Sequence, residues 1–162
     1  LIHSYSILYG IKSIALRYAN VVGQRLRHGV VYDFVRKLKR NPYSLEILGD
    51  GTQIRSYIYI EDAIKATMIA LDNINEPFKA YNVASEDWIT VREVANIVVR
   101  TMGLRKVEYV YKPILHGIGW LGDVKKIALN IEKLKMLGFY PQYTSAEAIK
   151  LTVKALLKEI TI

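Results

Sequence analysis

One arginine stands alone in a strand-like stretch of tyrosines and isoleucines, directly after a glycine turn. This residue, Arg55, lies in ILGDGTQIRSYIYIED, residues 47–62. A guanidinium offers a planar fork of N–H donors that matches phosphate oxygens, and a glycine turn lets a ligand approach the backbone closely. Arg55 is therefore a candidate phosphate ligand. The same sequence is compatible with an exposed strand arginine that pairs with Glu61 or Asp62, two acids placed to cap the next helix and to complement its dipole.

A second candidate, Asn20, stands in LRYANVVG, residues 16–23, where a strand gives way to a loop. Ligands of open α/β sheets collect at such positions, although an asparagine that satisfies loop backbone would look the same.

A third motif, GIGWLG at residues 117–122, matches the glycine fingerprint of dinucleotide sites. That fingerprint requires a strand that turns directly into a helix. Here residues 113–117 separate the motif from the preceding strand, and Asp123 stands where the helix should begin. We therefore interpret the segment as a flexible loop.

The chain has 162 residues, 51% hydrophobic and 23% charged, and this balance predicts one folded domain with a sizeable core. No apolar run approaches the roughly 20 residues of a membrane-spanning helix, and no signal peptide opens the chain, so we expect a cytoplasmic protein without membrane association. Because cysteine is absent and the three histidines are far apart in the sequence, neither a disulfide nor a metal centre is expected.

The formal net charge of +8 favours anionic partners, which could be nucleic acid, a phosphorylated metabolite or an acidic protein. The densest basic cluster, residues 36–40, fits the carboxyl end of a helix, where cations complement the helix dipole. No strand face interleaves aromatic and basic residues, and no recognition-helix signature is present, so nucleic acid is not the expected partner.

Apolar periodicity predicts strands at residues 12–19, 45–48, 54–60, 81–84 and 107–111. It predicts helices at residues 30–40 and 63–72, a short helix from Asn130 to Gly138, and helices after capping boxes at Thr90–Glu93 and Thr144–Glu147. The alternation of strands and helices predicts an α/β fold. The opening LIHSYSILYG predicts a helix that stops at Gly10 and lacks an N-cap, so we expect the chain to be a fragment.

Five segments follow one another along the chain: ALRYANVVG, HGVVYDFVRKL, LEILGDGTQIRSYIYIEDA, YNVASEDWITVREVA and GDVKKIALNIEKLKMLGF. In this order and spacing they closely resemble the C-terminal half of the nucleotide-sugar epimerases and dehydratases, the extended short-chain dehydrogenase family that UDP-glucose 4-epimerase typifies. The resemblance covers essentially the whole chain. It implies a C-terminal substrate-binding portion, with residues 1–162 as a single nucleotide-sugar-binding domain and with strands from the edge of a Rossmann sheet.

The resemblance also implies an isomerase whose NAD-binding Rossmann half lies outside this sequence. In that family a Tyr-x-x-x-Lys pair takes a proton from the sugar hydroxyl while hydride passes to NAD, but none of the twelve tyrosines here has a lysine four positions later. The Gly-rich cofactor turn is missing too. The chain is therefore expected to bind a UDP-sugar or related nucleotide sugar, to be inactive alone, and to leave NAD to the complete enzyme. Unpaired sheet edges imply that it needs the missing half or self-associates.

Carried over position by position, the resemblance implies that the diphosphate would be bound by Asn20, Arg55 and the backbone N–H groups of Gly29 and Val30, consistent with anion binding at helix starts. The base would lie beside Glu46, Ile47 and Leu48. The nicotinamide side would be approached by Tyr18 and Ala19.

The chain departs from the family pattern at two places. Ser56 follows Arg55 where many relatives have aspartate, and residues 118–121 lack the second phosphate-binding arginine of many relatives. Lys125 or Lys126 could compensate for the missing cation. The departures leave two alternatives open: a non-catalytic basic module for nucleic acid or a regulatory partner, and a piece of a sugar-nucleotide 4,6-dehydratase.

Overall fold

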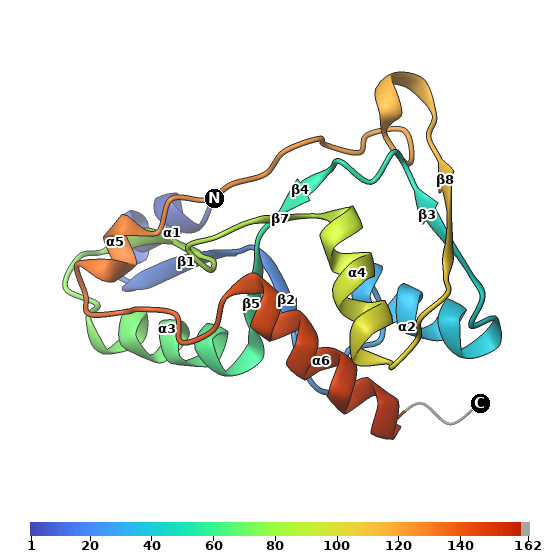
Figure 1. Cartoon of the computed structure of the whole chain (residues 1–162). Helices are drawn as coiled ribbons and strands as arrows, with labels where there is room; N and C mark the ends of the chain where they lie inside the picture. Colours follow the sequence, from blue (N-terminus) through green and yellow to red (C-terminus); the bar gives the residue numbers. More distant parts are fainter. Residues whose placement is uncertain (160–162) are drawn as a thin grey trace.

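The computed structural model of the protein describes residues 1–159, in which helices and strands alternate (Figure 1). This alternation confirms the predicted α/β class. The helices are α1 (Ile2–Tyr9), α2 (Val30–Arg40), α3 (Ile60–Asp72), α4 (Val91–Thr101), the 3-10 helix η1 (Leu115–Gly117), α5 (Glu132–Lys135) and α6 (Ser145–Glu159). The strands are β1 (Ser13–Tyr18), β2 (Asn20–Val22), β3 (Ser44–Leu48), β4 (Ile54–Arg55), β5 (Tyr57–Tyr59), β6 (Phe78–Val83), β7 (Ile89–Thr90) and β8 (Glu108–Lys112).

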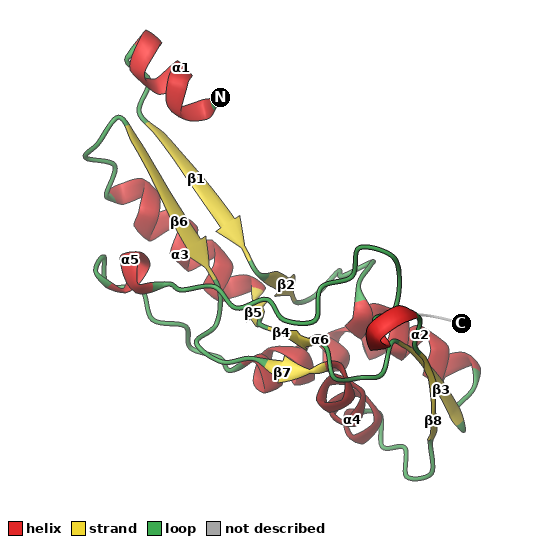
Figure 2. Ribbon diagram, turned by 90° about the horizontal axis from the view of Figure 1, so that it is seen from above, coloured by secondary structure: helices red, strands yellow, loops and turns green. Residues whose placement is uncertain are grey.

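The strands of the described residues associate in four pairs. The pairs β1–β6, β2–β5 and β3–β8 are parallel, and β4–β7 is antiparallel. β1 and β6 lie side by side from Ser13↔Phe78 to Tyr18↔Val83 (Figure 2). Within residues 1–159, β1 has no strand on its other edge. That edge presents backbone N–H and C=O groups that a further strand could pair with.

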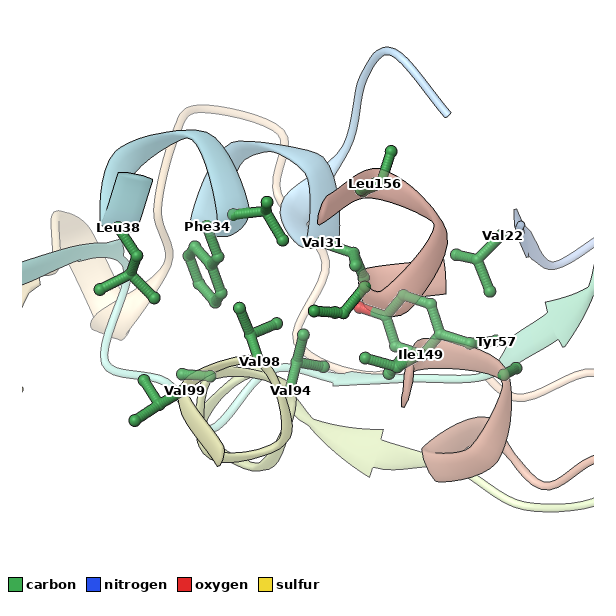
Figure 3. Close-up of a cluster of buried hydrophobic side chains, with 14 of the residues drawn as sticks. Val22, Val31, Phe34, Leu38, Tyr57, Val94, Val98, Val99, Ile149 and Leu156 are labelled. Carbon is green, nitrogen blue, oxygen red and sulfur yellow. The ribbon is translucent and has the colours of Figure 1, made fainter. Parts of the chain in front are cut away.

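Three helices enclose the larger hydrophobic core. In Figure 3, α2, α4 and α6 direct apolar side chains toward one another, among them Phe34, Val98 and Ile149. The helix predicted at residues 30–40 is confirmed as α2, in which Phe34 and Leu38 are buried and Val30 is only partly buried. This packing fixes the N-terminus of α2, because three helical turns of the same element are held in the core.

The second hydrophobic core lies beside α3. The face of α3 that it buries is not the face that carries the largest apolar side chains. α3 packs against β1, β5 and β6, with Ala63, Ala66 and Ala70 on its buried side. The apolar stripe formed by Ile64, Met68 and Leu71 is about half exposed. Alanines allow a helix to approach a neighbouring sheet closely, so small residues form the buried side. The larger side chains therefore form an apolar surface on the outside of α3.

Both capping boxes are confirmed. The Thr90 hydroxyl accepts a hydrogen bond from the backbone N–H of Glu93, and the Glu93 side chain accepts one from the backbone N–H of Thr90. Thr144 and Glu147 make the same reciprocal pair at the start of α6. Local signals of this kind determine helix starts, because each box satisfies two backbone donors that lack a partner inside the helix.

Two sequence-based expectations need correction near residue 60. The strand predicted at 54–60 is broken at Ser56 into β4 and β5, and α3 begins at Ile60. Asp62 does not cap α3. It lies in the first turn, is 1% exposed, and its Oδ2 accepts hydrogen bonds from the backbone N–H groups of Gln142 (3.0 Å) and Tyr143 (3.1 Å). Asp62 therefore anchors the segment that precedes α6.

Candidate functional site

A cleft of about 420 Å³ opens between β2, the N-terminus of α2 and the end of β3. Five of the residues named from the sequence line it: Asn20, Gly29, Val30, Leu48 and Arg55. They come from four separate segments, so the fold brings together side chains that lie up to 35 positions apart in the chain. The cleft is also lined by Gln53, Tyr57 and Trp120, which no local sequence pattern marks as ligand-binding.

Asn20 begins β2, directly after the carboxyl end of β1. Its side-chain Nδ2 donates a hydrogen bond to the backbone carbonyl of Ser56 (3.0 Å), and its backbone N–H donates to the same carbonyl (3.3 Å). The two bonds fix the amide beside the β4–β5 break.

The Ser56 side chain points into a buried hydroxyl network and away from any solvent. Its Oγ lies 2.7 Å from Ser85 Oγ, which lies 3.0 Å from Ser145 Oγ. The backbone N–H of Ser145 donates in turn to the carboxylate of Asp87 (2.9 Å). This network connects the break between β4 and β5 to the start of α6. It explains how serine is accommodated here, since its hydroxyl is satisfied inside the protein.

Arg55 pairs with an acid that the sequence analysis did not consider as its partner. Its Nη2 donates to Asp123 Oδ1 at 2.8 Å, and its Nη1 donates to the backbone carbonyl of Ile54 at 2.8 Å. The Asp123 side chain is 1% exposed and that of Arg55 is 14% exposed. Neither Glu61 nor Asp62 forms the ion pair that the sequence had allowed. A charge pair this deeply buried has few water molecules to replace its hydrogen bonds, so its geometry is well defined.

The second oxygen of Asp123 secures the loop beside the cleft. Asp123 Oδ2 accepts hydrogen bonds from Gln53 Nε2 (3.2 Å) and from the backbone N–H of Gly119 (3.0 Å). The glycine motif at 117–122 therefore forms a loop, as expected, but a loop that is attached to the cleft by a buried carboxylate. No helix follows it directly, so it cannot hold a pyrophosphate in the manner of a dinucleotide turn.

Neither lysine that could replace a missing arginine lines the cleft. Lys125 forms an ion pair with Asp50 and also donates to Thr52 Oγ1 (2.9 Å). Burial opposes ionisation of Asp50, but hydrogen bonds from Lys125 and Thr52 outweigh it and lower the pKa of Asp50 to about 2. Lys126 lies over the ring of Trp88, with its Nζ 5.6 Å from the ring centroid.

The groups around the cleft suit binding better than proton transfer. Burial raises the pKa of Tyr57 to about 12, although the positive charge of Arg55 acts in the opposite direction. Tyr57 is therefore a neutral phenol at physiological pH. Asp33 forms an ion pair with Lys37 at 2.8 Å, and both oxygens of Asp123 accept hydrogen bonds from the protein. Within residues 1–159 no group of three histidine or acidic side chains could hold a metal ion.

The remaining residues named from the sequence lie elsewhere. Of the three placed beside the base, only Leu48 lines the cleft, because Ile47 is buried in the larger core and the Glu46 carboxylate pairs with Lys37 at 3.5 Å. The Tyr18 hydroxyl lies 2.6 Å from Thr67 Oγ1.

Ala19 lines an adjoining cleft of about 340 Å³ that shares Asn20, Gly29 and Val30 with the first one. Within residues 1–159, no strand runs directly into a helix through a G-x-G-x-x-G turn. No helix in this part of the chain is long and apolar enough to cross a membrane.

The fold and the cleft define an α/β protein that presents an arginine, an amide and a helix N-terminus to one ligand-sized space. The family model described as "NAD dependent epimerase/dehydratase family" matches residues 1–84, about half of the chain. The chain belongs to this family.

Individual relatives agree with this assignment. The putative UDP-glucose 4-epimerase of Methanocaldococcus jannaschii is 34% identical over 153 residues, which cover 92% of this chain and 47% of that protein. A crystal structure of UDP-galactose 4-epimerase matches with a TM-score of 0.85 and 43% identity, over 99% of this chain and 50% of the other. The UDP-glucose 4-epimerase of Thermotoga maritima, solved with UDP-glucose, matches with a TM-score of 0.84 and 32% identity, again over 99% and 50%. The chain thus spans about half the length of these relatives.

Proposed function

We propose that this chain is the nucleotide-diphosphate-sugar-binding portion of a UDP-sugar 4-epimerase-like enzyme. The single observation that carries the proposal is the convergence of Arg55, Asn20 and the N-terminus of α2 on one cleft. A guanidinium and helix N–H groups are suited to phosphate oxygens, and an amide adds a directional hydrogen bond. A 4,6-dehydratase of the same family would use the same portion to bind its substrate.

The N-terminus of α2 contributes backbone donors in this proposal. Gly29 is the N-cap, with φ 86°, and no side chain caps the helix. The first N–H groups of a helix lack internal partners, so those of Gly29 and Val30 are available for a phosphate. A side chain at position 29 would be strained at this positive φ.

We propose further that residues 1–162 form one nucleotide-sugar-binding domain that works together with a Rossmann half. That half would supply the Tyr-x-x-x-Lys pair and the cofactor turn, and NAD would accept and return a hydride there. The open edge of β1 supports this, as does the apolar surface of α3 at Ile64, Met68 and Leu71. α1, which lies at the amino ends of β1 and β6 (Figure 2), adds further exposed apolar area through Tyr5 and Leu8. Alone, the chain would self-associate and would not catalyse epimerisation.

Isothermal titration with UDP-glucose tests the binding role. The Arg55→Met variant should bind roughly 10- to 150-fold more weakly than the wild type, because a hydrogen bond to a charged group contributes about 1.5–3 kcal/mol. Arg92→Met is the matched control, since Arg92 donates to the Tyr111 hydroxyl (2.9 Å) and does not line the cleft. A wild-type chain that binds no UDP-glucose, or an Arg55→Met variant that binds as well as the control, would refute the proposal.

Two further measurements test the domain assignment. The purified chain, supplied with NAD and UDP-glucose, should show no turnover, and light scattering should show concentration-dependent association. Turnover by the chain alone would contradict the claim that its acid–base pair lies elsewhere. A clean monomer that binds no apolar dye would contradict the exposed interface.

A further inference from the structure

Trp120 places a large indole at one end of the cleft. The side chain is 54% exposed, although it lines the same space as Arg55 and Leu48. The adjoining backbone is packed against β3, since a Cβ on Gly119 would lie 3.0 Å from the Leu48 carbonyl carbon and 3.0 Å from its Cβ. Trp120 and Leu48 therefore belong to the same end of the cleft.

The position of Trp120 is fixed by hydrogen bonds on both sides. The backbone N–H of Gly119 donates to Asp123 Oδ2 (3.0 Å), and the backbone N–H of Asp123 donates to the carbonyl of Trp120 (3.1 Å). Asp123 is in turn paired with Arg55. The backbone that carries the indole is thus held in a tight turn attached to the guanidinium, which limits the backbone entropy lost when a ligand packs on the ring.

The charges around the cleft cannot by themselves account for strong binding of a diphosphate. Arg55 is the one cation that lines the cleft within residues 1–159, and the carboxylates of Asp33 and Asp123 line it as well. The apolar lining is more extensive, and includes Val30, Phe34, Leu48, Val91 and Trp120. A flat, uncharged ring is the ligand group that best matches such a wall.

We propose that Trp120 is a nucleotide-binding residue that stacks on the nucleobase of the ligand, with Leu48 on the opposite side of the base. The inference rests on the proposed function, because it assigns the base end of the same cleft. Base stacking on an aromatic side chain is favourable for every base and needs no charge. The phosphates then extend from this end toward Arg55 and the N-terminus of α2.

Tryptophan fluorescence of a Trp88→Phe variant reports on Trp120 alone, since the chain has two tryptophans. Uridine monophosphate should quench this emission at saturation, because its base stacks on the indole. Ribose 5-phosphate, which lacks the base, should leave the emission unchanged. Equal quenching by both compounds, or none by uridine monophosphate under conditions in which it binds, would overturn the inference.

Titrations with uridine monophosphate and UDP-glucose give the second test. Trp120→Ala should weaken the binding of both by the same factor, about fivefold or more, and Trp120→Phe should retain most of the affinity. Trp88→Ala is the matched control, because Trp88 is similarly exposed (52%) and does not line the cleft.

The outcomes separate the inference from the proposed function. Three results would overturn the stacking role alone. Trp120→Ala could weaken the binding of UDP-glucose only, or it could weaken the binding of both ligands by less than twofold. The wild-type chain could also bind UDP-glucose but not uridine monophosphate. Failure of the wild type to bind either ligand would refute the proposed function, and the inference with it.

Discussion

Asp123 is the residue whose replacement tests the organisation of the cleft most directly. Its two oxygens accept hydrogen bonds from Arg55, Gln53 and the backbone of Gly119, and its side chain is almost fully buried. Asp123→Asn keeps the size and shape of the side chain. It removes the negative charge and replaces one acceptor oxygen with an NH₂ donor, so at least one of the three donors must face another donor.

The expected cost follows from these contacts. Breaking a buried ion pair by removing one partner costs about 3–5 kcal/mol, because the remaining charge lacks its counterion. Arg55 keeps its 2.8 Å hydrogen bond to the Ile54 carbonyl and a longer one of 3.5 Å to the Lys125 carbonyl. These bonds reduce the free energy lost when the ion pair is broken. We therefore expect Asp123→Asn to lower the free energy of unfolding by about 3 kcal/mol, at the lower end of that range.

Urea denaturation followed by circular dichroism measures this change. Asp33→Asn is the matched control, because Asp33 lines the same cleft but forms a partly exposed i,i+4 pair with Lys37. Asp33→Asn should lower the free energy of unfolding by less than about 0.5 kcal/mol. A double-mutant cycle with Arg55→Met should then give a coupling free energy of more than about 1 kcal/mol. A loss below 1 kcal/mol for Asp123→Asn, or strictly additive costs in the cycle, would show that the pair does not hold the cleft together.

Two more predictions concern a helix start and the acid limit of stability. Thr90→Ala should lower the free energy of unfolding by about 1 kcal/mol, because it removes the capping box of α4, and Thr90→Ser should restore it; equal urea midpoints for the two variants would contradict this. The pKa of Asp50 is lowered from 3.8 to about 2 in the folded protein, so its ionised form stabilises the fold above pH 4 and this contribution is lost as pH falls toward 2. Lys125→Met should therefore flatten the dependence of unfolding free energy on pH between 4 and 2, and an unchanged slope would show that Lys125 does not lower that pKa.

Local sequence signals predicted the helices well. Apolar periodicity predicted a helix at residues 30–40, which are the bounds of α2. The two capping boxes predicted where α4 and α6 begin. Each of these signals involves residues within one or two helical turns, so the sequence itself contains both partners. Side-chain size was a poorer guide on α3, where alanines are buried and Ile64, Met68 and Leu71 are exposed.

The contacts that shape the site were not predictable in this way. Arg55 and Asp123 are separated by 68 positions, and Asp62 and Gln142 by 80. A nearby acid looked like the natural partner of Arg55 because spacing along the chain was the only guide. The one signal for Asp123 was its place after Gly122, in a loop that otherwise lacks charge between residues 117 and 122. Local pattern made Arg55 and Asn20 candidates beside structural alternatives, and the family resemblance favoured the ligand role and added the start of α2.

The ion pair explains how Arg55 can be buried and still serve a ligand. A guanidinium has five N–H donors, and its hydrogen bonds to Ile54, Lys125 and Asp123 use three of them. Two donors remain for phosphate oxygens, and their direction is set before any ligand arrives. The same pair neutralises most of the charge that would attract a diphosphate from a distance. In the proposed binding mode, orientation is gained at the expense of long-range attraction. The binding free energy would then come from close contacts, namely phosphate hydrogen bonds at Arg55 and α2 and base stacking on Trp120.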